Sequence, residues 1–222
     1  MFEWFGHKRR AARPAAERHS LEESLVGVET ATPDQAQAVW LDLASRGSDA
    51  AAGLRAYVQR RPGDAEPLRL WLSVDSGEDF VVAIVHLLQH PDPAVVKRVL
   101  NALPSPPPAP QRLLPVVLAL LQDADAELRE LACFRLPMLA HSDEVATALS
   151  ARLDDSAPVV QFAAVTALGH LGTQAARAVP ALRQLADCRD SVSMDFTPAG
   201  DTICLGDAAQ TAIRRIERSS AR

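Results

Sequence analysis

The spacing of apolar residues predicts helices along most of the chain. Between residues 32 and 76, start and stop signals divide the sequence into three short helices. Thr32 and Pro33 begin one that runs to about 46, Ser48 caps one that runs to about 60, and Asp64 caps one that ends before Gly77. Because proline is accommodated in the first turn of a helix but not deep inside it, the start at Pro33 is well marked.

From about residue 78 the pattern becomes an internal repeat. Three segments align without gaps, at offsets of 33 and 32 residues: LLQHPDPAVVKRVLNAL from Leu87, LLQDADAELRELACFRL from Leu120 and RLDDSAPVVQFAAVTAL from Arg152. A fourth copy begins at Cys204, at an offset of 45, which leaves about 13 extra residues before it. Each unit has the pattern of a helix, a tight turn rich in Asp and Pro, and a second helix.

Within each unit the apolar residues form one stripe per helix. The second helices repeat apolar residues at i, i+4 and i+8, which are Val95, Val99, Leu103; Leu128, Ala132, Leu136; Val160, Ala164, Leu168; and Leu205, Ala209, Ile213. The first helices carry Val81, Ile84, Leu88 and then Leu114, Val117, Leu121. A two-helix unit cannot bury both of its faces alone, so the units must stack. The predicted fold is all-α: an α-solenoid of stacked antiparallel helix pairs.

The extra residues before the fourth copy have a different period. Val192, Met194 and Phe196 alternate with polar residues, a Gly-containing turn follows at 197–201, and the alternation resumes with Thr202 and Ile203. Period-two alternation around such a turn predicts a small β-hairpin near 190–203. The alternative is an irregular loop packed by its apolar residues. Insertions in a regular array often carry binding specificity.

Charge and composition divide the remainder of the chain. Residues 1–19 have a net charge of +3 and place Phe2, Trp4 and Phe5 beside basic residues, while the whole chain has a formal charge of −5. We interpret 1–19 as a flexible basic tail. It is either frayed or folded back on the body, or it is a hook for a partner or an anionic membrane surface. Residues 20–77 are a helical cap or degenerate repeats, and 78–218 form the repeat array.

Composition supports the helical fold and a soluble protein. The chain has 39 Ala and 28 Leu but ten aromatic residues, which favours helices over sheets. No apolar run approaches the 18 residues of a membrane span. The start of the chain has its apolar residues before its charges, the wrong order for a signal peptide, so we expect a cytoplasmic protein.

Residues 78–218 resemble HEAT repeats, including the short variant of phycobilisome-lyase-like proteins. The resemblance rests on the LL-x-D-x-D-x-x-LR-xx-A pattern from Leu120 to Ala132 and on the Ala-Leu-Gly-His-Leu-Gly ending at 167–172. The Asp-and-Arg ladder of that family is represented by Asp125 and Arg129 in one repeat. The position of Arg129 is Val96, Gln161 and Gly206 in the other copies. The sequence therefore predicts apolar stacking between repeats and leaves their polar ordering open.

Three sets of residues raise the question of chemistry. His86 and His90 have the i, i+4 spacing of metal ligands, but no third ligand is evident and His90 lies at a helix end. The paired carboxylates Asp123/Asp125 and Asp154/Asp155 fall in tight turns, where Asp bonds the local backbone. Cys133, Cys188 and Cys204 are scattered, and we interpret them as small buried residues. We expect no catalytic residue, no cofactor and no metal.

The second helices carry a candidate partner-binding strip. We expect these helices to line the concave face, as the resemblance implies, and positions two residues past each core residue point about 200° away from the core. This strip comprises Lys97, Asn101, Glu130, Phe134, Met138, Phe162, Thr166, His170, Asp207, Thr211 and Arg215. Its apolar members Phe134, Met138 and Phe162 are either a protein-binding cluster in a charged rim or part of the core between repeats.

The function that these features favour is a non-catalytic interaction module that binds another protein. One alternative is an enzyme or enzyme subunit of the bilin-lyase-like class that the resemblance implies. Another is nucleic-acid binding through two basic clusters, but nearby acids and the negative total charge oppose it. The clusters are Arg214, Arg215 and Arg218, and Arg55, Arg60 and Arg61. The partner and the oligomeric state do not follow from the sequence.

Overall fold

The computed structural model describes residues 32–46, 48–62, 64–74, 78–187, 191–193 and 202–220. The basic tail 1–19, with Phe2, Trp4 and Phe5, lies outside the described residues, as do Cys188 and the middle of the insertion.

Within these ranges the chain is built mainly of helices. They are α2 (Pro33–Arg46), α3 (Ser48–Arg60), α4 (Ala65–Val74), α5 (Glu78–Leu88), α6 (Pro93–Ala102), α7 (Pro110–Leu120), α8 (Ala126–Leu139), α9 (Asp143–Ser150), α10 (Pro158–Leu171), the 3-10 helix η2 (Gly172–Ala178), α11 (Val179–Ala186) and α12 (Leu205–Ser220). The starts expected at Pro33 and Ser48 and the ends at 46 and 60 are confirmed.

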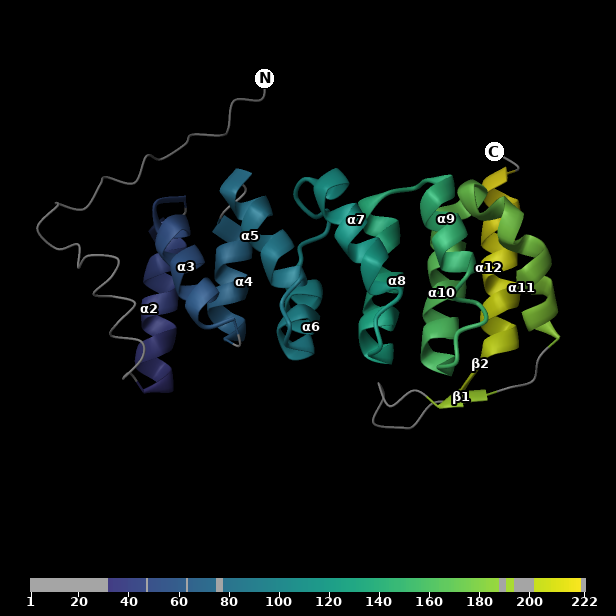
Figure 1. Ribbon diagram of the computed structural model, residues 1–222, viewed down its shortest axis with the longest axis horizontal. Coiled ribbons are helices and arrows are strands. Elements are labelled where there is room, and N and C mark those ends of the chain that lie inside the picture. The colour runs from purple at the N-terminus through teal and green to yellow at the C-terminus, as the bar shows by residue number, and fades with distance from the viewer. Residues whose placement is uncertain are drawn as a thin grey trace, which may run out of the picture.

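The helices stack in two rows, which makes the fold an α-solenoid (Figure 1). The second helices of successive pairs pack on one another in the order α4, α6, α8, α10 and α12, with α2 against α4. We call the side chains that this row presents away from the core the second-helix face. In the other row, α3 packs on α5 and α5 on α7, while α9 packs on η2. The pair α3 and α4 therefore extends the stack on the N-terminal side of residue 78.

Turn carboxylates start several of the second helices. Asp92 Oδ1 accepts a hydrogen bond of 2.9 Å from the Ala94 amide, and Asp125 Oδ1 accepts one of 2.9 Å from the Glu127 amide. These bonds satisfy backbone donors that the first turn of a helix leaves unpaired. The spacing of Asp and Pro in the repeat thus fixes where each of these helices begins.

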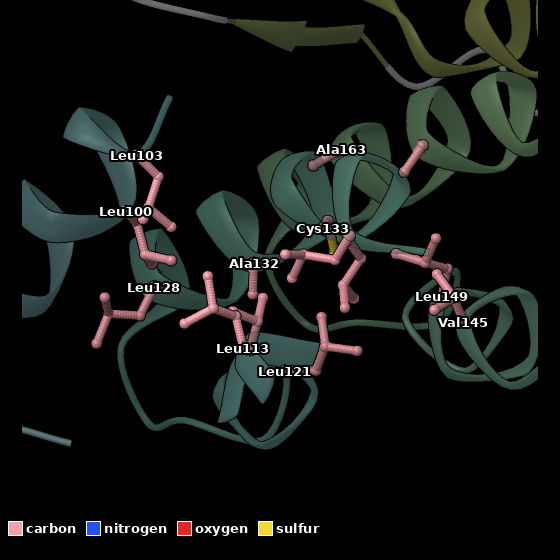
Figure 2. Packing of buried hydrophobic residues seen from close by; sticks show 14 of the residues in the cluster. Leu100, Leu103, Leu113, Leu121, Leu128, Ala132, Cys133, Val145, Leu149 and Ala163 are labelled. Carbon is pink, nitrogen blue, oxygen red and sulfur yellow. The ribbon is translucent and has the colours of Figure 1, made fainter. Parts of the chain in front are cut away.

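One hydrophobic core runs through the stack. Figure 2 shows it passing from Leu100 on α6 to Leu128 on α8, and on to Leu149 on α9 and Ala163 on α10. The core residues predicted for the second helices are buried, except that Ile213 is half-buried and Ile216 is buried in its place. In α7, the expected core position Leu114 is half-buried, while Leu113 beside it is buried.

The insertion contains a short antiparallel β-hairpin. Strand β1 (Ser191–Ser193) pairs with β2 (Thr202–Cys204), with Val192 opposite Ile203. The period-two pattern thus predicted the strand pairing. At 191–193 and 202–204 the chain forms paired strands and not the irregular loop of the alternative. Strand β2 continues directly into α12, so the hairpin lies at the start of the last second helix (Figure 1).

No helix in the described ranges combines the length and the apolar character that a membrane crossing requires.

Candidate functional site

A buried ion pair links the turns of the second and third repeats. The Arg129 guanidinium on α8 donates two hydrogen bonds to Asp155, with Nη2 2.7 Å from Oδ1 and Nε 2.9 Å from Oδ2. Asp155 is buried, and Oδ1 also accepts from the Ala157 amide at 2.9 Å. The bond from Arg129 holds the pKa of Asp155 below its ordinary value of 3.8. This pair is part of the fold, because both charges are neutralised within it.

A second, more exposed pair links the first and second repeats. Lys97 on α6 lies 2.7 Å from Asp125 and also contacts Glu127, and the hydrogen bond to Asp125 raises the pKa of the lysine. Polar contacts therefore link the first repeat to the second and the second to the third, which the sequence did not predict. The reason is that Lys97, one position after Val96, has a side chain long enough to reach the acid at the start of the next second helix.

Two of the other residues considered for chemistry bond the local backbone. Asp123 Oδ1 accepts from the Asp125 amide at 2.8 Å, and His90 Nδ1 accepts from the Asp92 amide at 3.1 Å. These side chains stabilise turns, as the turn interpretation predicted for the paired carboxylates. Cys133 is buried, which raises the pKa of its thiol to about 12, while Cys204 is half-buried.

On α6 and α8 the residues of the predicted strip differ in how exposed they are. Asn101 and Met138 are exposed, whereas Phe134 is half-buried and packs against the core. Glu130 corrects the expectation of a surface position: it is 6% exposed, and its Oε1 has no hydrogen-bond partner within the described structure. Burial, with the charge of Glu127, raises the pKa of Glu130.

Between α10 and α12 the strip becomes an open groove of about 260 Å³. Its walls include Phe162 and Thr166 from α10 and Thr211 and Arg215 from α12. These residues recur at i+4 along each helix, so each helix contributes one continuous stripe to the groove. Phe162 is half-buried and packs against the core on one side while it lines the groove on the other. The structure thus brings together the predicted residues of the last two repeats.

The floor of the groove consists of small residues that the sequence pattern did not single out. Gly169, Ala208 and Ala212 line it. A Cβ built on Gly169 would lie 3.1 Å from the Ala212 Cα, and one on Gly172 would lie 3.0 Å from the Ser219 Oγ. From Gly169 on α10 to Gly172 just past its end, residues further along the chain meet residues further along α12. The two helices are therefore parallel, with a close contact beneath the groove.

The groove continues into a polar hollow at the C-terminal ends of both helices. This hollow has a volume of about 360 Å³ and is lined by Gly169, His170, Arg215, Arg218 and Ser219. Gly169 and Arg215 line both spaces. Arg215 Nη1 lies 3.5 Å from His170 Nε2, a long contact in which the arginine can only donate.

The charges around the hollow are unequal. Glu217 is paired with Arg183 of α11 at 3.2 Å, whereas Arg214, Arg215 and Arg218 make no ion pair with any residue in the described ranges. At the opposite end of the groove stands the acidic Asp207. We call the part lined by His170, Arg215, Arg218 and Ser219 the basic end of the groove. The arrangement can hold an apolar side chain above the floor and an anion at the basic end.

Comparison with known proteins identifies the repeats. Residues 114–194 match the family described as HEAT repeats, whereas no curated protein matches the chain significantly. A solved engineered protein superposes with a TM-score of 0.50 at 22% identity, over 91% of this chain and 98% of its own.

Two further solved structures are designed proteins. A designed armadillo repeat protein in complex with the peptide (KR)4 gives a TM-score of 0.51 at 17% identity, over 89% of this chain and all of its own. Computationally designed armadillo repeat proteins for modular peptide recognition give 0.50 at 17% identity, over 88% and 99%. These likenesses are of fold. The chain is therefore an α-solenoid, in which residues 114–194 match the family described as HEAT repeats and the neighbouring helix pairs continue the same stacking.

Proposed function

We propose that this protein is a non-catalytic scaffold that binds an extended segment of another protein in the groove between α10 and α12. The observation that carries the proposal is the groove itself, which has a small-residue floor, one aromatic wall at Phe162 and polar walls at Thr166 and Thr211. An apolar centre within a polar rim is typical of protein-binding surfaces.

The dimensions of the groove suit an extended chain. Asp207 and Arg218 are eleven positions apart on α12, which is about 16 Å at 1.5 Å per residue. About five residues of extended chain span that distance. Two of the similar folds are a designed protein in complex with a peptide and designed proteins for peptide recognition, so this architecture is compatible with such a partner.

The groove is less suited to catalysis. Its carboxylate, Asp207, and its imidazole, His170, lie at opposite ends, so the two do not form an acid–base pair around one bond. The open shape also leaves a bound molecule in contact with water. These features favour a binding surface over the lyase-like alternative.

A display selection with a blocked variant tests the proposal. A library of random peptides of about twelve residues, more than twice the span of the groove, would be selected on the full chain. The selected peptides would then be measured against Thr211→Trp, which fills the groove from an exposed position, and against Gln210→Trp as a matched control. Gln210 is the exposed neighbour of Thr211 on α12 and does not line the groove.

The expected result is that the selected peptides bind the wild type and Gln210→Trp with equal affinity and lose at least about tenfold in affinity for Thr211→Trp. Thermal unfolding of the three proteins would establish that both tryptophan variants are folded. Selected peptides that bind Thr211→Trp as tightly as the wild type would place binding elsewhere and refute the groove as the site.

A further inference from the structure

We propose that the partner segment is acidic, with an apolar side chain over the small-residue floor and carboxylates at the basic end of the groove. The inference rests on the proposed function, because it assigns the chemistry of the segment that the same groove binds. It follows from the unequal charges at the two ends of the groove and from the position of the apolar floor between them.

The basic end has hydrogen-bond donors without a strong acceptor among the described residues. Arg215 Nη1 and His170 Nε2 approach to 3.5 Å, at the limit of a hydrogen bond, and both line the hollow with Arg218. The hydroxyl of Ser219 donates to the Arg215 carbonyl at 2.9 Å, so it is engaged within α12. A carboxylate has two oxygens and accepts from a guanidinium in the strongest hydrogen bonds that side chains form. It would replace a weak contact with charge-assisted bonds.

The elements packed around the basic end do not neutralise it. On α12, Glu217 is engaged with Arg183 of α11, and Asp207 lies near the start of the same helix, about 12 Å of helical rise from Arg215. On the neighbouring α8, the last charged side chain is Arg135, whose guanidinium donates to the Asn101 carbonyl at 3.0 Å. Among these described groups, the acids are thus paired or distant from the basic end, and Arg135 is engaged with the end of α6.

The dipoles of α10 and α12 also favour cations at the C-terminal ends of these helices. This stabilisation applies to Arg214 as it does to Arg215 and Arg218. Arg214, however, lines neither part of the groove, and its Nε donates to the Gln210 carbonyl at 3.2 Å. Helix stability alone would make the three arginines equivalent. The groove distinguishes them, which makes Arg214 a control on the same helix with the same charge.

A peptide fits better than a nucleic acid. Nucleic-acid binding relies on many cations that replace counterions along a backbone. Here the cations occupy one end, the floor between them and Asp207 is apolar, and Asp207 would repel a phosphate backbone that continued along the groove. An acidic peptide with one apolar residue complements all three parts.

The test uses labelled peptides of defined composition. Fluorescein-labelled Gly/Ser peptides of about nine residues would carry one Leu and a Glu pair, at every spacing that the roughly five-residue span allows. Matched sets would replace the Glu pair by Lys or by Ser, and a labelled single strand of thymidines would represent nucleic acid. Fluorescence polarisation would measure each against the full-length wild type, Arg215→Glu/Arg218→Glu, Arg214→Glu and Thr211→Trp.

We expect the best Glu peptide to bind the wild type at least about tenfold more tightly than its Ser counterpart, and added salt to reduce that preference. The double variant should lose the preference for Glu and bind the Lys peptide better than the wild type does. Arg214→Glu should keep the preference for Glu. Thermal unfolding of both charge variants would show that they are folded.

Several outcomes would overturn the inference. Preference for Glu that survives in the double variant would place the acidic contact elsewhere, and an equal loss in Arg214→Glu would make it a general charge effect. A thymidine strand that binds more tightly than any peptide and depends on Arg215 and Arg218 would assign the basic end to nucleic acid. Binding of the Lys or Ser peptides that Thr211→Trp abolishes, without any preference for Glu, would refute the acidic partner and leave the proposed function standing.

Discussion

Two neighbouring junctions of the second-helix row differ in how they are closed. Between α8 and α10, the turn before α10 supplies Asp155 to Arg129, and the helices enclose Cys133 and Ala163 in the core. Between α10 and α12, the regular turn is replaced by the hairpin, and no ion pair between the two helices occurs among the described residues. The helices instead meet at Gly169 and Ala212, and a groove lies above that contact.

One register position shows the difference in a single side chain. Lys97 on α6 pairs with acids of the next repeat, Glu130 on α8 is buried, and Phe162 on α10 lines the groove. The three residues occupy the same position in successive repeats, so the environment of each side chain depends on how the neighbouring helix packs against it. Where the turn is regular, an ion pair joins the neighbouring second helices. Where the insertion replaces the turn, α10 and α12 line a groove that a partner can enter.

The largest effect should come from Asp155→Asn, which removes charge at the closed junction. Asparagine can still accept from the Ala157 amide, so the change leaves the turn intact and deprives Arg129 of its carboxylate. Breaking a buried pair on one side typically costs about 3–5 kcal/mol. The matched change Asp125→Asn, at a pair whose side chains are 22% and 29% exposed, should cost less than about 1 kcal/mol. Urea unfolding measures both.

The pH dependence of Asp155→Asn follows from the lowered pKa of Asp155. A folded pKa below the ordinary value of 3.8 means that the ionised carboxylate stabilises the folded state above that value. This stabilisation is lost as the pH falls from 3.8 toward the lower folded pKa. The difference between the wild type and Asp155→Asn should therefore shrink on acidification, and a difference that stays constant down to pH 3 would contradict the assignment.

Next in size is the effect of Gly169→Val, which tests the contact beneath the groove. In Gly169→Ala the added Cβ lies 3.1 Å from the Ala212 Cα, and the crowding opposes a gain of about 1 kcal/mol in helix propensity, so stability should change little. Valine adds two methyl groups against the same backbone and should cost about 1–3 kcal/mol by overpacking. Thermal unfolding would compare both with Thr166→Val, a change one turn away that leaves the helix spacing unaltered. A Gly169→Val protein as stable as the wild type would show that the helices can separate freely.

Much of the fold could be predicted from the sequence because turn chemistry and helical period are local properties. The start at Pro33, the caps at Asp92 and Asp125 and the strand pairing opposite Val192 all follow from a few neighbouring residues. The strip on α10 and α12 was also predictable, since it needs only the register of the repeat.

The remaining features depend on how the helices rotate against one another. A rotation in α7 buries Leu113 in place of Leu114. On α8 the predicted core residues are buried as expected, but Glu130, which a polar pattern would leave on the surface, is buried as well. The groove floor was missed because Gly169 and Ala212 are small residues whose closeness appears only when two helices meet. The contact of Lys97 with Asp125 was missed because a long side chain can reach across from one register position away.

The smallest effect should come from Glu130, whose buried carboxylate on α8 lowers the stability of the fold. Burial raises its pKa, so the folded state holds a proton more tightly than the unfolded chain does, and ionisation at neutral pH destabilises the fold. Glu130→Gln should therefore raise stability at pH 7 by about 1 kcal/mol, or about 2–4 °C in Tm for a chain of this size. The gain should decline as the pH falls through the raised pKa of Glu130 toward the ordinary value of 4.5, because the wild-type carboxyl is then neutral as well. Glu144→Gln serves as the control, since Glu144 is exposed and its change should give no comparable gain. A Glu130→Gln protein less stable than the wild type at pH 7 would mean that the carboxylate has a favourable partner, and the closed junction would then carry no such cost.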